Sequence, residues 1–152
     1  MFNYTPTENC LLNKTILVTG AGSGIGRQAA LTYAKLGATV ILLGKTVDKL
    51  ESVYDEIVAN GSAEPAIIPL DLKGATKQNY IDMSSTIASQ FGKLDGALFN
   101  ASMLGELTPY DQIHEQIWDE VIKVNVTAQH LMAQALIPTL LLADNASLVF
   151  TS

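Results

Sequence analysis

The chain has 152 residues, a length typical of one domain with a sizeable hydrophobic core. Hydrophobic residues make up 48% of it and charged residues 16%, which excludes an intrinsically disordered composition. The net charge is −6 and Arg27 is the only arginine, so no basic surface for nucleic acid is expected. The single cysteine excludes an internal disulfide, and no residues at metal-ligand spacing predict a metal site.

Short apolar runs rich in β-branched residues alternate with longer amphipathic stretches along the chain. The short runs predict strands at residues 15–19, 38–43, 66–70, 94–99 and 147–151. The longer stretches predict helices at residues 25–36, 47–59 and 75–91, and a long helical stretch from the turn at 108–111 to about Leu142, kinked at Pro138. This alternation predicts an α/β fold, a doubly wound parallel sheet with helices on both faces, as one domain over residues 1–152.

A proline in the third predicted strand and the position at which the sequence ends lead to two further predictions. Pro69 requires its strand to lie at a sheet edge or a bulge. The sequence ends inside the last predicted strand, at residues 150–152, whereas a doubly wound sheet normally covers its last strand with another helix. We therefore expect the sequence to be part of a longer chain, with the fold truncated after the fifth strand.

The N-terminal segment and the apolar runs bear on location. Residues 1–9 contain neither a basic start nor an apolar segment of the kind found in signal peptides. The apolar runs are all shorter than the roughly 18 residues that cross a membrane. The sequence therefore predicts a cytoplasmic protein without a membrane partner.

Residues 19–26, Thr-Gly-Ala-Gly-Ser-Gly-Ile-Gly, form the most informative motif. They follow a predicted strand and open a predicted helix, the context in which a glycine-rich turn binds a dinucleotide. Glycines let the backbone approach a phosphate closely, and the N-terminal amides of the following helix face the anion. The residues predicted to bind the cofactor here are Thr19, Gly20, Ser23, Gly24, Ile25 and Gly26.

The spacing of the motif, Thr-Gly-x-x-x-Gly-Ile-Gly, resembles that of the short-chain dehydrogenase/reductase (SDR) family. The resemblance covers the whole chain, and residues 11–13, 40–44, 133–137 and 147–152 look closest to the bacterial YciK-like oxidoreductases. It implies a Rossmann fold, an oxidoreductase that transfers a hydride between a nicotinamide cofactor and a small carbonyl or alcohol substrate, and a homo-oligomer.

The end of the second predicted strand bears on the choice of cofactor. A site for NAD usually places an acidic residue about 20 residues after the glycines, where it bonds the ribose 2′-hydroxyl. That position is Gly44 here, and the next residue is Lys45, whose ammonium group attracts a 2′-phosphate. We therefore predict NADP(H) in preference to NAD(H); a solvated lysine at a helix start is the alternative.

Two segments after later strands also resemble the family. Asp71 and Leu72 close the third strand, where a family acid accepts a hydrogen bond from the adenine amino group; a turn or cap aspartate is the alternative. Asn100-Ala101-Ser102 follows the fourth strand and resembles the Asn-Ala-Gly segment beside the nicotinamide ribose. Ser102 departs from the family glycine and adds a hydroxyl there.

Asn125 is the one catalytic residue that the resemblance assigns within the chain. It lies among apolar residues in the long helical stretch, where asparagine is a poor helix former. It matches the tetrad asparagine of the family, which bends its helix and holds a water in a proton relay to the active-site lysine. The same stretch has charged residues that predict a solvated face, Asp111, Glu115, Asp119 and Glu120, and apolar residues that predict a packing surface, Ile117, Trp118, Val121 and Ile122.

The Tyr-x-x-x-Lys pair of the family has no match in this sequence. Four residues after its tyrosines stand Glu8, Gly37, Val58, Ser84 and His114. The resemblance places the catalytic serine, tyrosine and lysine beyond residue 152, and Ser152 itself is not assigned. The sequence thus predicts an NADP-dependent oxidoreductase. A non-catalytic dinucleotide-binding or redox-sensing module and an inactive truncated fragment are the alternatives.

Overall fold

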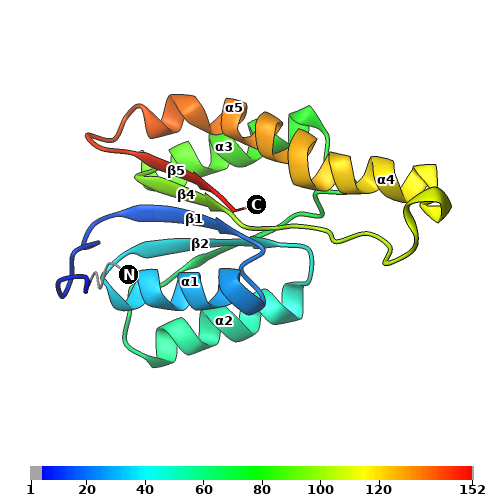
Figure 1. Ribbon diagram of the computed structural model, residues 1–152. Coiled ribbons are helices and arrows are strands. Elements are labelled where there is room, and N and C mark those ends of the chain that lie inside the picture. Colours follow the sequence, from blue (N-terminus) through cyan, green and yellow to red (C-terminus); the bar gives the residue numbers. More distant parts are fainter. Residues whose placement is uncertain (1–4, 152) are drawn as a thin grey trace.

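Residues 5–151 are described by the structure, a computed structural model of the chain (Figure 1). Its five strands form one parallel sheet in the order β3-β2-β1-β4-β5. They are β1 (Thr15–Thr19), β2 (Thr39–Gly44), β3 (Ala66–Pro69), β4 (Gly96–Phe99) and β5 (Ser147–Phe150). The predicted parallel α/β sheet is confirmed, with strand ends that shift by one or two residues. The predictions for residues 1–4 and for Ser152 lie outside the described residues.

Helices cover both faces of the sheet. One face carries α1 (Gly24–Lys35) and α2 (Val47–Ala59), and the other carries α3 (Lys77–Phe91) and α5 (Ala128–Leu140), as Figure 1 shows. The strand β3 forms an edge, and Pro69 is its last residue, as the missing proline amide requires.

The core consists of one apolar cluster on each side of the sheet. Successive strand residues point to opposite faces, so Leu17 of β1 packs towards α3 and α5 while Val18 packs towards α1 and α2. Both are fully buried. This burial fixes the register of β1 and with it the position of the turn at its carboxyl end.

The long helical stretch is not one regular helix. It begins with α4 (Glu115–Ile122), continues through a π-helical segment, η2 (Lys123–Thr127), and ends as α5. A short 3-10 turn, η1 (Tyr110–Gln112), precedes it. The predicted extent is therefore correct to within a few residues, but the helical geometry changes at η2, whereas Pro138 lies inside α5. Single π-helical turns of this kind are frequent at functional sites.

Residues 103–122, here called the arm, project beyond the sheet (Figure 1). The arm contains the loop after β4, η1 and α4. The predicted packing surface of α4 is wrong in part, because Trp118 is 51% and Ile122 37% exposed. Ile117 and Val121 are half-buried and lie against Gly105 of the loop. Among the described residues, no helix has the length and apolar character needed to span a membrane.

Candidate functional site

A cleft of about 460 Å³ crosses the carboxyl ends of β3, β2, β1 and β4. This is the edge of a doubly wound sheet where ligands bind, at the point where the strand order reverses between β1 and β4. The cleft is lined by Gly20, Gly22, Ser23, Leu43, Gly44, Lys45, Thr46, Lys49, Leu50, Leu70, Asp71, Leu72, Lys73, Asn100, Ala101, Ser102, Met103 and Val124.

The glycine turn between β1 and α1 is packed so tightly that side chains are excluded at Gly20 and Gly26. A Cβ atom at Gly26 would lie 2.3 Å from the carbonyl oxygen of Gly20 and 2.7 Å from Nδ2 of Asn100. Gly20 has a φ of +67°, a conformation that favours glycine, and lies against the Ala101 backbone. The glycines therefore bring the turn, the start of α1 and the loop after β4 into direct contact.

The N-terminus of α1 opens beside this turn. Ser23 is its N-cap residue, yet no side-chain hydrogen bond caps the helix, and the first turn contains no acidic residue. The first amides of a helix have no intrahelical partner, and the helix dipole favours an anion next to them. The exposed Ser23 and the start of α1 together form a site suited to a phosphate group.

Thr19 has a different position from the one expected of a cofactor-binding residue. It is 1% exposed, and its hydroxyl accepts hydrogen bonds from the amides of Asn100 and Ala101, each at 3.0 Å. Thr19 does not line the cleft. Its hydroxyl instead joins the end of β1 to the loop after β4, so that it positions two residues that do line the cleft.

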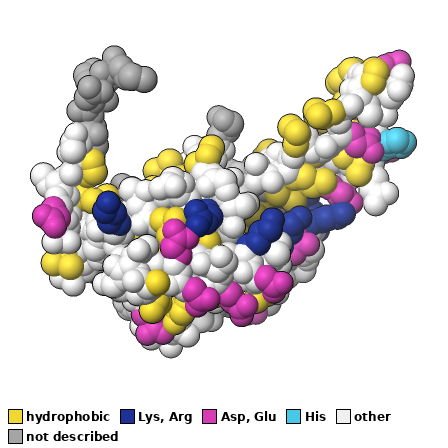
Figure 2. Space-filling view, turned by 90° about the horizontal axis from the view of Figure 1, so that it is seen from below, with side chains coloured by type: hydrophobic (Ala, Val, Ile, Leu, Met, Phe, Trp, Pro, Cys, Tyr) yellow, Lys and Arg dark blue, Asp and Glu magenta, His cyan; other side chains and the backbone are white. Residues whose placement is uncertain are grey.

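Two lysines lie on the wall formed by the end of β2 and the start of α2. Lys45 was predicted from the sequence, and Lys49, in the first turn of α2, was missed. Both are exposed, and neither forms an ion pair with any residue from 5 to 151. A Cβ atom at Gly22 would lie 2.9 Å from the Cβ atom of Lys49, so α2 approaches the glycine turn closely. Figure 2 shows lysine or arginine side chains along the boundary between the arm and the rest of the molecule.

The β3 end of the cleft is a compact turn. Oδ1 of Asp71 accepts a hydrogen bond from the Lys73 amide at 3.1 Å, and the Asp71 carbonyl accepts from the amides of Gly74 and Ala75. Asp71 is exposed to the cleft, while Leu72 is 6% exposed and belongs to the core. Asp71 therefore shapes a turn, as one alternative predicted, and it also faces the cleft.

The β4 end of the cleft is held by Asn125. Its Oδ1 accepts a hydrogen bond from the Met103 amide at 2.8 Å, and its Nδ2 donates one to the Met103 carbonyl at 2.9 Å. Asn125 lies in η2 and does not line the cleft, whereas Met103 and the exposed Ser102 do. The side-chain amide therefore fixes the backbone at one end of the cleft.

The predicted residues divide into two groups. Those that line the cleft are Gly20, Ser23, Lys45, Asp71, Leu72, Asn100, Ala101 and Ser102. Those that do not line it are Thr19, Gly24, Ile25, Gly26 and Asn125. Ile25 is 73% exposed on the surface beside the cleft-lining turn. Gly24 has open space around it and a φ of +55°.

One prediction about the arm is wrong and concerns the cleft directly. Asp111, Glu115 and Asp119 are exposed, as expected of a solvated face. The Glu120 side chain is only 13% exposed and forms an ion pair with Lys73, at 2.7 Å between Oε1 and Nζ. No group of three or more His, Cys, Asp or Glu side chains that could hold a metal ion occurs within residues 5–151.

Comparisons with known proteins agree with this geometry. A family model described as short chain dehydrogenase matches residues 14–152. The uncharacterized oxidoreductase YciK of Escherichia coli K12 is 45% identical over 150 residues, which cover 99% of this chain and 60% of the relative. A solved short chain dehydrogenase of Pseudomonas syringae has a TM-score of 0.97 and 43% identity, covering 100% of this chain and 62% of that one.

A further solved structure contains a bound cofactor. It is a short chain dehydrogenase of Escherichia coli CFT073 complexed with NADPH, with a TM-score of 0.94 and 44% identity, covering 97% of this chain and 61% of that one. The chain thus spans about 60% of the length of the relatives that it matches. The resemblance found in the sequence is confirmed: the chain belongs to the short-chain dehydrogenase family.

Proposed function

We propose that the protein containing this chain is an NADP(H)-dependent oxidoreductase that acts on a small carbonyl or alcohol substrate. The observation that carries the proposal is one cleft that joins an uncapped helix N-terminus to two lysines without ion-pair partners among residues 5–151. Such a cleft offers two separate sites for negative charge. A dinucleotide with a pyrophosphate and a 2′-phosphate carries its charge in two places.

The residues of the cleft fit this cofactor. The glycine turn, Ser23 and the first amides of α1 would hold the pyrophosphate, because a backbone without Cβ atoms can approach it closely. Lys45, with Lys49 beside it, would bind the 2′-phosphate. The relative from Escherichia coli CFT073, whose structure contains NADPH, supports this assignment.

The two ends of the cleft would then bind the two bases. Asp71 and Leu72 would lie beside the adenine, and Asn100, Ala101 and Ser102 beside the nicotinamide ribose. When bound, the nicotinamide supplies the chemistry of hydride transfer. The residues of this chain bind and orient it, and Asn125 acts as a positioning residue because its amide fixes Met103.

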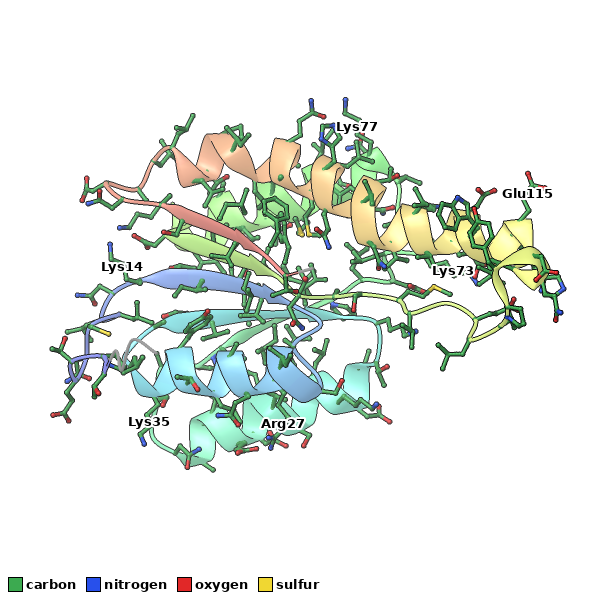
Figure 3. All side chains as sticks on the ribbon, viewed as in Figure 1. Lys14, Arg27, Lys35, Lys73, Lys77 and Glu115 are labelled. Atoms are coloured by element: carbon green, nitrogen blue, oxygen red, sulfur yellow. The ribbon has the colours of Figure 1, made fainter. Side chains whose placement is uncertain are left out.

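The choice of cofactor is tested by binding measurements on the purified protein. We expect NADPH to bind more tightly than NADH, by about tenfold or more, since one charge-assisted phosphate contact contributes about 1.4 kcal/mol. Lys45→Glu should abolish this preference. Lys35→Glu changes the net charge equally at the far end of α1 and should retain it (Figure 3). Equal affinity for the two cofactors would contradict the assignment of Lys45.

The reaction is tested separately by following NADPH absorbance at 340 nm with a panel of aldehydes and ketones. Oxidation of NADPH that depends on one of these substrates is the expected result. Tight NADPH binding without turnover of any carbonyl, and without reduction of NADP by the corresponding alcohols, would instead support the dinucleotide-binding module.

A further inference from the structure

The ion pair between Lys73 and Glu120 connects the β3 end of the cleft to the arm. Lys73 lines the cleft and lies in the turn shaped by Asp71, whereas Glu120 lies in the last turn of α4. Figure 3 shows Lys73 beside α4, with Glu115 at the far end of the same helix. The two residues are distant in sequence, so the contact joins two separate elements of the fold.

The burial of Glu120 distinguishes this contact from an ordinary surface ion pair. The Glu120 side chain is 13% exposed, against 52% for Lys73. A carboxylate that is largely shielded from water gains more from a cationic partner than a fully exposed one does. Besides Lys73, the structure gives Oε1 of Glu120 one long contact, with Nε2 of Gln116 at 3.5 Å. Lys73 is therefore the main partner of this carboxylate.

The same helical unit also holds the other end of the cleft. Asn125, in the π-helical segment that continues α4, is bonded to both backbone groups of Met103. Val124, next to it, lines the cleft directly. One helical unit thus contacts the turn at the β3 end through Glu120 and the loop at the β4 end through Asn125.

We propose that Glu120 is a positioning residue. Through its ion pair with Lys73 it holds the β3 end of the cofactor cleft in a fixed position relative to the β4 end. The inference rests on the proposed function, since it assigns to the arm a role in binding the dinucleotide. A ligand that spans the cleft and contacts both ends stabilises the arrangement in which both are held. NADPH binding should therefore also order arm residues that do not line the cleft, between residues 104 and 122.

Hydrogen exchange of the arm, read by mass spectrometry, tests the tether in the protein without cofactor. Lys73→Met and Glu120→Gln should each speed exchange of amides in residues 104–122 by about fivefold, the equivalent of about 1 kcal/mol. The charge-swapped pair Lys73→Glu with Glu120→Lys should restore slow exchange. Lys77→Met and Glu115→Gln remove exposed charges nearby, without ion pairs to residues 5–151, and serve as matched controls.

Cofactor affinity tests the coupling to the site. Glu120 does not line the cleft, so a direct contact with NADPH does not explain an effect of its substitution. We expect Glu120→Gln to weaken NADPH binding about fivefold and to abolish the slowing of arm exchange by NADPH, while Glu120→Asp retains part of both. The unfolding free energy of Glu120→Gln should stay close to that of the unaltered protein, which separates positioning from general destabilisation.

The outcomes distinguish the two proposals. If the unaltered protein binds NADPH but Glu120→Gln leaves both the affinity and the arm exchange unchanged, the positioning role is wrong and the proposed function stands. If the unaltered protein does not bind NADPH, the proposed function fails, and so does the coupling. The exchange data without cofactor still report whether the ion pair holds the arm.

Discussion

The two ends of the sheet both carry polar and charged groups, but the groups are arranged differently. At the amino end, the carboxylate of Asp95 accepts hydrogen bonds from the Thr15 amide and from the ammonium groups of Lys14 and Lys93, each at 3.0 Å. At the carboxyl end, Lys45, Lys49 and the start of α1 have no comparable partners among residues 5–151. Figure 3 shows Lys14 and Lys73 on opposite sides of the molecule.

Polar groups that have partners within the protein stabilise the fold, whereas polar groups without such partners are available to bind a ligand. Buried polar groups in folded proteins are normally hydrogen-bonded, and the Asp95 side chain, 3% exposed, follows that rule. Ser23, Lys45 and Lys49 in the cleft are exposed instead, so water satisfies them until a ligand replaces it. Substitutions at the amino end should therefore change stability alone, and substitutions in the cleft should change binding.

We expect the largest effect from Gly26→Ala, because this substitution in the glycine turn should lower both the stability of the fold and the affinity for NADPH. Its Cβ atom would lie 2.3 Å from the Gly20 carbonyl oxygen, a backbone atom that cannot move without deforming the turn. We expect the unfolding free energy to fall by about 3 kcal/mol and the Kd for NADPH to rise about 100-fold. Urea unfolding and a binding titration measure the two effects.

A matched control exists at the end of α2. Gly61 has a φ of +73° and no atom within 4 Å of an added Cβ, so Gly61→Asn should change stability by less than about 1 kcal/mol. NADPH affinity should not change, because Gly61 does not line the cleft. Normal NADPH binding by Gly26→Ala would show that the turn does not form the phosphate site.

Asp95→Asn should affect stability alone. The neutral amide cannot pair with Lys14 and Lys93, although both lysines are partly exposed and water can solvate them. We expect the unfolding free energy to fall by about 2 to 3 kcal/mol, with unchanged NADPH affinity. Asp119→Asn makes the same charge change at an exposed position and should cost less than about 0.5 kcal/mol. A large loss of NADPH affinity in Asp95→Asn would contradict the separation of the two ends.

The same carboxylate predicts a pH dependence. Burial raises the pKa of Asp95, but the hydrogen bonds from Thr15 and the two lysines outweigh it and hold the pKa below its ordinary value. The stabilisation is therefore present above the pKa of an unfolded aspartate, about 3.9, and is lost as the pH falls through the lower folded value. Unfolding measured between pH 2 and pH 5 should depend less on pH in Asp95→Asn. Identical slopes in the two proteins would exclude this source of acid sensitivity.

Thr19→Val tests a residue that should affect both the stability of the fold and the binding of NADPH. The substitution keeps the size of the side chain and removes the hydroxyl that accepts from the Asn100 and Ala101 amides. We expect about 2 kcal/mol of lost stability, since two amide groups lose their acceptor, and a weaker affinity for NADPH because both residues line the cleft. Thr19→Ser keeps the hydroxyl and should retain the affinity. Unchanged binding in Thr19→Val would show that the hydroxyl does not position this loop.

Local signals allowed most of the fold and eight of the eighteen residues that line the cleft to be predicted. Short apolar runs predicted the strands because the central strands β1, β2 and β4 are buried on both faces, as Leu17 and Val18 are. The glycine turn was predicted because the residues that form it are consecutive in the chain and can be recognised together. Lys49 could have been found by the same reasoning, since it lies in the first turn of the predicted helix that follows the second strand.

Long-range contacts explain what the sequence did not reveal. Glu120 resembles its exposed neighbour Asp119 in sequence, and only the folded structure brings it to Lys73. Thr19 carries the motif of a cofactor site, yet its hydroxyl is used by Asn100, a residue distant in the chain. Asn125 was identified by resemblance, but its partner Met103 depends on how η2 meets the arm. Spacing indicates chemical type, and the tertiary structure decides which partner each group finds.

The smallest expected effect concerns His114 and Glu106, an exposed pair that closes the loop of the arm at 2.9 Å between Nδ1 and Oε2. The hydrogen bond and charge of Glu106 raise the pKa of His114 above its ordinary value. The pair therefore contributes most below the pKa of an unfolded histidine, and its contribution is lost as the pH rises through the folded value. An NMR titration of the imidazole should give a lower pKa for His114 in Glu106→Gln than in the unaltered protein. Since the pair is exposed and lies outside the cleft, any loss of NADPH affinity in Glu106→Gln should be smaller than in Glu120→Gln. An unaltered His114 titration in this variant would show that the contact does not persist in solution, and the loop would then depend on the Gly105 packing and the Asn125 bonds alone.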